Sequence, residues 1–127
     1  MNIAEAASLT GLSIDTIRYY ERATMLPSLP RDTRGWRHFD PPALDWLKIL
    51  ERLRATGMPM AEMRRFAQLV FDRNDDAQAA MQERLEILAL HRKRLAQKRA
   101  ELAACERFVD MKIRMYSADL EALNADP

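Results

Sequence analysis

The spacing of apolar residues changes character along this chain. Over residues 3–22 and 41–71 they recur every three or four positions in short stretches, which predicts short amphipathic helices. Over residues 77–117 they recur every seven positions without a Gly or Pro, which predicts one long helix. The segment from 23 to 40 shows neither period. The pattern therefore predicts a mainly α-helical protein, with a small domain at residues 1–72 before the long helix.

The first stretch, IAEAASLTGLSIDTIRYYER at residues 3–22, has the layout of two helices joined by a tight turn. Ala7 is small enough for the helices to cross, Gly11 suits the turn, and Ile17 is an apolar anchor on the second helix. Side chains that commonly cap helix N-termini precede both helices: Asn2 and Ser13. These features predict a helix-turn-helix at residues 2–22, a motif whose second helix reads DNA.

A short segment rich in arginine and aromatic residues follows. Pro27 and Pro30 exclude a continuous helix before it. The string RDTRGWRHF at residues 31–39 has a turn signal near Gly35, and its aromatic residues favour strands. The sequence therefore predicts a small β-hairpin, or wing, over residues 31–39.

Two longer helices are predicted at residues 41–56 and 60–71. Asp40 followed by Pro41 is a strong helix start signal, and Gly57 is a natural helix stop. Their apolar faces are formed by Leu44, Leu47, Leu50 and Leu53 or Arg54 on the first, and by Met60, Met63, Phe66 or Ala67 and Val70 on the second. The polar run at residues 72–76 predicts a domain boundary.

The long stretch at residues 77–117 carries a heptad row of apolar residues: Met81, Leu88, Leu95, Leu102, Val109 and Tyr116. A second row has Leu85 and Ile113 near its ends but is interrupted by Arg92, Arg99 and Glu106. A helix of about 40 residues spans roughly 60 Å, too long to bury this stripe against the small domain. We therefore expect a coiled coil with a second copy of the chain, and a C-terminal tail at residues 118–127.

The heptad rows also indicate an antiparallel orientation. In a pair centred between Lys98 and Arg99, Leu95 would face the partner's Leu102, an arrangement that satisfies itself under a two-fold axis. His91 and Arg92 would lie near the partner's Glu106. Centres at Leu95 or Leu102 fit nearly as well, so the register stays open.

Composition narrows the class of protein. The chain has 127 residues with a net charge of only +1, so any surface that binds DNA must gather its positive charge locally. The single cysteine, Cys105, excludes an intrachain disulfide framework and favours a reducing, cytoplasmic setting. No apolar run approaches the roughly 20 residues of a membrane span, and the N-terminus lacks a signal-peptide pattern.

Taken together, these segments resemble those of a MerR-type transcription regulator. The resemblance rests on IAEAASLTGLSIDTIRYYER, then RDTRGWRHFD, then LKILERLRATGMPMAEMRRF, then the heptad helix. It implies a winged helix-turn-helix dimerised by a long antiparallel helix, acting on a near-palindromic operator inside a promoter. The implied activity is to bend and untwist the DNA so that RNA polymerase can use both promoter elements.

Two positions depart from the family pattern. The family usually has glycine a few residues after the Tyr-Tyr-Glu string, where this chain has Thr24, so the exit from the second helix is expected to differ. The family wing often carries tyrosines where this chain has Trp36 and Phe39, which retains stacking but removes a hydroxyl.

Candidate DNA contacts follow from the polar face of the second helix and from the wing: Ser13, Thr16, Arg18, Tyr19, Arg22, Arg31, Arg34, Trp36 and Arg37. Arg18 is the first candidate for a base contact, because its guanidinium can grip a guanine edge. The wing arginines are expected to contact phosphates. Asp15 is expected to be solvated, and His38 to be a surface or hairpin residue. Trp36 would either pack on a sugar-phosphate edge or cover the hairpin.

Two features of the long helix leave alternatives open. The basic cluster from His91 to Arg99 contains no acid and is either a solvated face or an anion or effector site near the dimer axis. Cys105 is either a small buried apolar residue or a redox switch. Residues 117–127 contain no Cys or His, so a metal sensor with a cysteine loop after the helix is not expected.

The leading hypothesis is a homodimeric DNA-binding transcription regulator that uses no metal or cofactor. RNA polymerase would be an indirect partner, and a small-molecule inducer is compatible with the sequence but not identified by it. The alternative is a coiled-coil adaptor that keeps a helix-turn-helix only as scaffold. We do not expect an enzyme, because the sequence shows no catalytic triad, phosphate loop or paired carboxylates.

Overall fold

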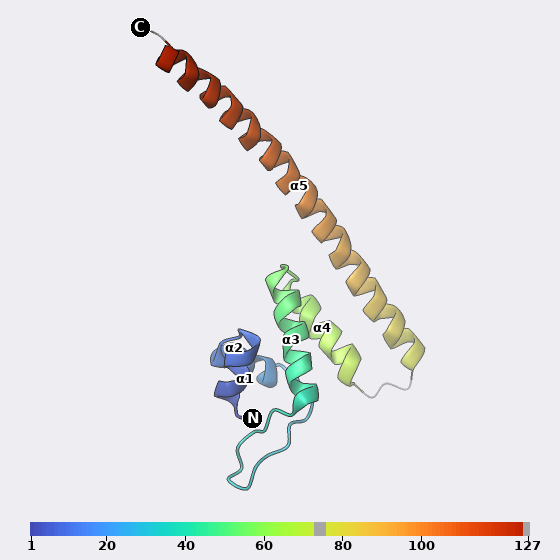
Figure 1. Ribbon diagram of the computed structural model, residues 1–127. Helices are drawn as coiled ribbons and strands as arrows, with labels where there is room; N and C mark the ends of the chain where they lie inside the picture. The colour runs from blue at the N-terminus through green and yellow to red at the C-terminus, as the bar shows by residue number, and fades with distance from the viewer. Residues whose placement is uncertain (73–75, 126–127) are drawn as a thin grey trace. The chain divides into compact units, whose positions relative to one another are not determined.

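A computed structural model describes residues 1–72 and 76–125 of the chain. Over these residues the protein is mainly helical (Figure 1), with α1 at Ile3–Thr10, α2 at Ile14–Arg22, α3 at Pro41–Ala55, α4 at Met60–Phe71 and α5 at Ala77–Ala125. The chain divides into two compact units, Met1–Ala89 and Leu90–Pro127, which we describe separately.

Helices α1 and α2 form the predicted helix-turn-helix. Asn2 caps α1 by accepting a 2.8 Å hydrogen bond from the Glu5 amide, and Ser13 caps α2 through a 3.0 Å bond from the Thr16 amide. Gly11 takes the left-handed conformation, with φ of 79°, that closes the C-terminal end of α1. Ile17 is fully buried, as an anchor on the second helix requires.

The exit from α2 uses a left-handed residue that is not glycine. Thr24 has φ of 57°, and its amide donates to the Glu21 carbonyl at 3.1 Å. The Met25 amide donates to the Tyr20 carbonyl at 2.9 Å. These two bonds form the usual glycine-type helix ending, so the replacement of glycine does not change the path of the chain. The backbone of Thr24 is instead strained, because a β-branched side chain disfavours this positive φ.

Helices α3 and α4 begin and end where their sequence signals predict. Asp40 caps α3 by accepting from the Ala43 amide at 3.1 Å. Gly57, with φ of 87°, closes its other end while the Met58 amide reaches the Leu53 carbonyl at 3.0 Å. Pro59 then precedes α4. The predicted apolar faces point inward, since Leu47, Leu50, Met63, Phe66 and Ala67 are buried and Leu44, Leu53, Met60 and Val70 pack against them.

Trp46 is a core residue that the sequence analysis missed. Its indole Nε1 donates to the Met25 carbonyl at 2.7 Å, which ties α3 to the segment after α2. Its ring stacks on Phe66 with centroids 6.0 Å apart and meets Phe71 edge-on at 4.8 Å. Trp46 therefore joins α3, α4 and the loop after α2.

The predicted wing is a minimal hairpin. In the part of the chain that the structure describes it contains one antiparallel bridge, between Arg31 and Arg37, and no regular strand. The His38 amide donates to the Pro30 carbonyl at 2.8 Å, but Pro30 has no N–H with which to extend the ladder. Figure 1 shows this segment as an extended loop that projects beyond the short helices.

The long helix α5 exceeds its predicted bounds. We expected it to end near residue 117 and a tail to follow at 118–127, but it continues to Ala125 because no Gly or Pro interrupts residues 77–125. The continuation adds Leu120 and Leu123, both exposed, to the apolar rows. None of the described helices combines the length and apolar composition that a membrane span needs.

The first turns of α5 belong to the N-terminal unit. Ala80 is buried, and Ile87 packs against the core. Arg84 donates to the Leu69 carbonyl at 2.7 Å, and Arg65 on α4 pairs with Glu83 through two N–H groups, one at 3.0 Å. The domain boundary predicted at 72–76, of which residues 73–75 lie outside the described residues, therefore does not coincide with the end of the compact unit at Ala89.

Candidate nucleic-acid interface

The polar face of α2 presents two arginines to solvent. Arg18 and Arg22 are exposed, and the side chain of Arg18 is 53% accessible. Arg18 approaches Asp15 no closer than 4.0 Å, and the Asp15 side chain is almost fully solvated. An exposed ion pair at that distance contributes little, so it does not hold Arg18 away from a DNA edge.

The other candidate DNA contacts on α2 also stabilise the fold. The Ser13 hydroxyl donates to the Thr16 hydroxyl at 2.8 Å while accepting from its amide, so both residues build the start of the helix. Tyr19 is half-buried against the core, with its ring 6.2 Å from that of Tyr20. The buried Tyr20 hydroxyl has no hydrogen-bond partner among the described residues, and burial raises its pKa.

Asp32 organises the tip of the hairpin. One carboxylate oxygen accepts hydrogen bonds from the backbone amides of Arg34 at 2.9 Å and Trp36 at 3.0 Å. The other lies 3.3 Å from the Arg34 guanidinium. Hydrogen bonding from the Trp36 amide, with smaller contributions from Arg34, lowers the pKa of Asp32. Gly35 completes the turn with φ of 80°, and its amide donates to the Asp32 carbonyl at 2.9 Å.

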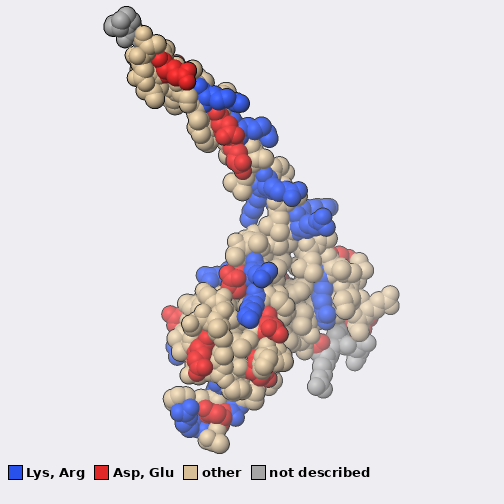
Figure 2. Space-filling model, in the orientation of Figure 1, with Lys and Arg blue, Asp and Glu red and all other residues tan. Residues whose placement is uncertain are grey.

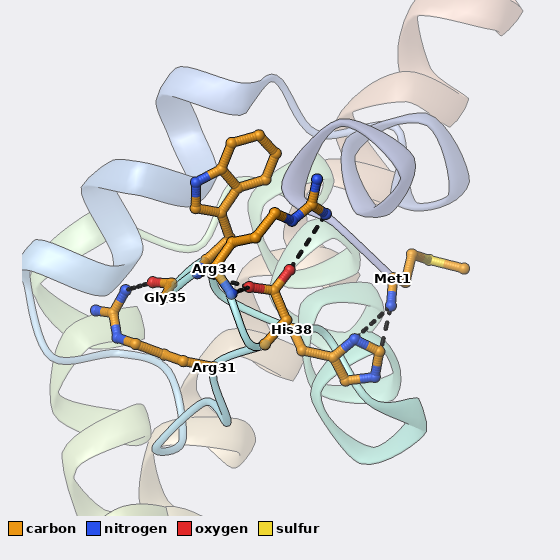
Figure 3. Close-up of polar contacts among 7 residues, drawn as sticks. Met1, Arg31, Arg34, Gly35 and His38 are labelled. Atoms are coloured by element: carbon orange, nitrogen blue, oxygen red, sulfur yellow. Dashed lines mark hydrogen bonds and ion pairs between the residues drawn. The ribbon is translucent and has the colours of Figure 1, made fainter.

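The other side chains of the hairpin surround this turn. The Arg34 guanidinium lies 4.3 Å from the centre of the Trp36 ring, which is 58% exposed. Trp36 therefore does not cover a hairpin core, which was one of its two predicted roles. Figure 3 shows Arg31 reaching the Gly35 carbonyl, a 2.9 Å hydrogen bond, and His38 beside the Met1 amine at 2.7 Å.

An ion pair joins the hairpin to α2. The Nε atom of Arg37 lies 2.5 Å from a carboxylate oxygen of Glu21, without an aligned hydrogen bond at that nitrogen. Both side chains are about two-thirds buried. Glu21 was not among the predicted site residues, and no local spacing could have indicated it because it lies sixteen positions before Arg37.

The positive charge of this surface is interleaved with acidic side chains. Residues 13–39 hold five arginines and three acids, a net charge of +2. Each of the three acids faces an arginine in the structure: Asp15 faces Arg18, Glu21 faces Arg37 and Asp32 faces Arg34. Among the described contacts, Arg22 and Arg31 have no acidic partner. Figure 2 shows the resulting interleaving of basic and acidic side chains over the short-helix unit.

The predicted dimerisation residues are exposed in the single chain. Their accessibility runs from 36% at Leu95 to 66% at Tyr116, and the set comprises Met81, Leu85, Leu88, Leu95, Leu102, Val109, Ile113 and Tyr116. Cys105 is exposed in the single chain as well. Within the described ranges no group of three or more His, Cys, Asp or Glu side chains is placed to hold a metal ion.

Comparisons with known proteins identify the family. Residues 1–69 match the family described as MerR HTH family regulatory protein. An uncharacterised HTH-type transcriptional regulator of Haemophilus influenzae is 32% identical over 108 residues, which cover 85% of this chain and 75% of that protein.

Two solved structures share the fold over nearly the whole chain. A MerR family regulator from Listeria monocytogenes superposes with a TM-score of 0.83 at 28% identity, over 98% of this chain and 91% of that one. HiNmlR, a MerR family regulator lacking the sensor domain and crystallised bound to promoter DNA, gives 0.78 at 30% identity, over 97% and 94%. The matched family consists of regulators and not enzymes. The chain therefore belongs to the MerR family of helix-turn-helix regulatory proteins.

Proposed function

We propose that this protein is a homodimeric transcription regulator that binds a near-palindromic operator within a promoter and activates transcription by bending and untwisting the DNA. The observation that carries the proposal is the Glu21–Arg37 ion pair, which joins the recognition helix to the arginine-rich hairpin. A helix and a wing held together in this way can grip adjacent grooves of one duplex. The relative HiNmlR, crystallised on promoter DNA, supports the same use of the fold.

Each arginine has a distinct role in this proposal. Arg18, exposed on α2, reads a base edge in the major groove. Arg22, Arg31 and Arg34 contact phosphates and make binding sensitive to salt. Arg37 acts mainly as a positioning residue, because its guanidinium is engaged by Glu21.

The other candidate residues support these contacts. Ser13 and Thr16 lie at the N-terminal end of α2, where backbone amides and the helix dipole favour a phosphate. Tyr19 offers its exposed edge to the DNA backbone, and the accessible face of Trp36 packs on a sugar-phosphate edge.

The exposed apolar stripe on α5 supports dimerisation. A soluble monomer rarely presents so long a row of large apolar side chains to water. Pairing with a second, antiparallel copy covers the row and holds two reading heads, each formed by residues 1–72, at a fixed spacing. RNA polymerase then responds to the distorted promoter without needing to contact this protein.

The decisive experiment combines DNA binding with transcription. In a gel-shift at low salt, the purified chain should bind a near-palindromic segment upstream of its own gene or of a neighbouring divergent gene. Transcription in vitro from that promoter by purified polymerase should then rise on addition of the protein. A protein that dimerises but binds no such segment would instead be the coiled-coil adaptor.

Dimerisation is tested with a matched pair of variants. Leu95→Asp places a charge in the apolar row and should yield a monomer in sedimentation equilibrium that no longer binds the operator. Met115→Asp places the same charge on an exposed methionine outside both heptad rows and should remain dimeric. A Leu95→Asp variant that still sediments as a dimer would remove the stripe as the interface.

A further inference from the structure

A shallow hollow on α5 has the geometry of a coiled-coil hole. It is lined by Arg92, Leu95, Ala96 and Arg99. This spacing, i, i+3, i+4 and i+7, is that of the four residues that surround one knob from a facing helix. Ala96 leaves the centre of the hollow open because its side chain is a single methyl group. The hollow is therefore suited to one side chain of a second helix.

The chemistry of this hollow calls for an anionic side chain. Arg92 and Arg99 flank it, and neither forms an ion pair within the described part of the chain. No acid occurs between Glu86 and Glu101, and Figure 2 shows blue side chains grouped along part of the long helix. An apolar occupant would leave two guanidinium groups uncompensated beside it.

The spacing of the heptad rows restricts how two copies can align. Going up the chain from Met81, core positions follow at alternating steps of four and three residues. In an antiparallel partner the chain runs the other way, so its core positions must follow the same steps of four and then three residues toward lower numbers. They do so only when the position opposite Met81 is Leu120, or lies a multiple of seven residues from it. Each residue of the Met81 row therefore faces a residue of the partner's Leu85 row. The extension of α5 to Ala125 supplies this position, which lies beyond the helix end predicted from sequence.

Three alignments satisfy this rule near the middle of the helix. They place the partner's Arg99, the partner's Glu106 or the partner's Ile113 into the hollow. Arg99 would add a third positive charge, and Ile113 would bring no negative charge into the hollow. Only Glu106 is complementary, and it too has no ion-pair partner among the described residues.

We propose that Glu106 of a second copy occupies the hollow between Arg92 and Arg99, and that this contact fixes an antiparallel register centred between Ala100 and Glu101. The proposal rests on the dimer proposed above. It moves the centre by two residues from the one between Lys98 and Arg99. The outer layers are then apolar: Met81 with the partner's Leu120, Leu85 with the partner's Tyr116, and Leu88 with the partner's Ile113.

The same contact selects the orientation. A parallel, in-register dimer would set Arg92 against Arg92, Arg99 against Arg99 and Glu106 against Glu106, three like-charged layers in one seam. The antiparallel pair instead forms two Arg-Glu-Arg clusters related by the two-fold axis. The charged core positions thus disfavour the parallel dimer, a common role of polar residues in coiled coils.

Charge reversal of the full-length chain tests the contact. Glu106→Arg should raise the dimer dissociation constant at least about 10-fold in sedimentation equilibrium, because two clusters per dimer become repulsive. Combining it with Arg92→Glu and Arg99→Glu should restore the constant to within about 3-fold of wild type. Glu101→Arg, which makes the same charge change outside both core rows, is the matched control and should have little effect.

The register is tested by oxidative cross-linking in a Cys105→Ser background. A chain carrying Leu88→Cys and Ile113→Cys should form dimers with two disulfides, because these positions share a layer. A chain carrying Leu88→Cys and Val109→Cys, which share a layer only when the centre lies between Lys98 and Arg99, should cross-link much more slowly. The reverse order would overturn the proposed register.

The outcomes separate this proposal from the one on which it rests. A dimeric wild type whose affinity is unchanged by Glu106→Arg would overturn the Glu106 contact and leave the dimer intact. Added inorganic phosphate that strengthened such a dimer would identify a free anion as the occupant, which also overturns the contact. A monomeric wild type at micromolar concentration would overturn both proposals.

Discussion

Arg37 of the hairpin lies 2.5 Å from Glu21 of the recognition helix, so that an acid on the proposed DNA-binding surface fixes the position of the wing. Placing a carboxylate on such a surface is unfavourable for DNA binding if only net charge is considered, because it repels phosphate. Its presence in this position is understandable if its main effect is to orient the wing. The two effects predict opposite outcomes when the acid is removed.

Glu21→Ala should weaken operator binding about 3–10-fold, because the wing loses the contact that orients it. The matched control is Asp15→Ala, which removes the same charge from α2, where Asp15 touches no hairpin residue among the described contacts. Asp15→Ala should leave the affinity unchanged or raise it. Fluorescence anisotropy with labelled operator measures both variants. If both substitutions raise the affinity equally, the Glu21–Arg37 pair has no positioning role.

Alanine substitutions of Arg18 and Arg34 should affect DNA binding in different ways. Arg18→Ala removes the proposed base contact and should cost about 1–3 kcal/mol on the operator, with little change on unrelated DNA. Arg34→Ala removes a phosphate contact and should weaken binding to all sequences, lowering the slope of log K against log salt by about 1. Titrations on operator and scrambled duplexes at several salt concentrations distinguish the two. An unchanged specificity ratio for Arg18→Ala would refute its assignment.

The parts of this structure that depend on neighbouring residues were predictable. Asn2, Ser13 and Asp40 cap helices because their side chains reach amides only three positions away. Gly57 ends α3 because it lacks a Cβ at a positive φ. Such contacts are encoded within one turn of chain, so a single sequence specifies them.

The parts that depend on distant contacts were not predictable in the same way. The Glu21–Arg37 pair joins elements whose relative position is set only after folding. Trp46 is a different case, because Ala43, Trp46 and Leu50 follow helical spacing and could have been identified as one buried face. The reduced hairpin also has a local reason, since Pro30 cannot donate to a second bridge.

Asp32 gives the hairpin a specific pH dependence. Its pKa lies below the ordinary 3.8, because the backbone amide of Trp36 and then Arg34 stabilise the carboxylate. A group with a lowered folded-state pKa contributes fully above its unfolded value, and that contribution is lost as pH falls through the folded value. The hairpin should therefore stay ordered through pH 4 and loosen only in stronger acid.

NMR titration measures this directly through the amide signals of Arg34 and Trp36. Both should shift together with a midpoint below 3.8. Asp32→Asn removes the titrating group and should abolish the shared transition. A midpoint at or above the ordinary value would mean that these amide hydrogen bonds do not persist in solution.

The positive φ of Thr24 predicts that its replacement by glycine stabilises the protein. Its φ of 57° disfavours a β-branched side chain by roughly 1–2 kcal/mol, whereas glycine adopts this angle freely but loses about 0.5–1 kcal/mol through its greater flexibility when unfolded. Thr24→Gly should therefore raise the free energy of unfolding by about 0.5–1 kcal/mol. Urea denaturation at one fixed protein concentration measures the change, since dimerisation couples stability to concentration.

The mirror-image control is Gly57→Thr, at the matching position after α3, where φ is 87°. It should destabilise the chain by about 0.5–1 kcal/mol, because it introduces the strain that Thr24 already carries, which exceeds what is gained by removing the flexibility of glycine. The one contact that opposes the prediction is the bond from the Thr24 hydroxyl to the Ala23 carbonyl, at 2.6 Å. If Thr24→Gly lowers stability while Gly57→Thr behaves as expected, that exposed hydrogen bond outweighs the backbone strain.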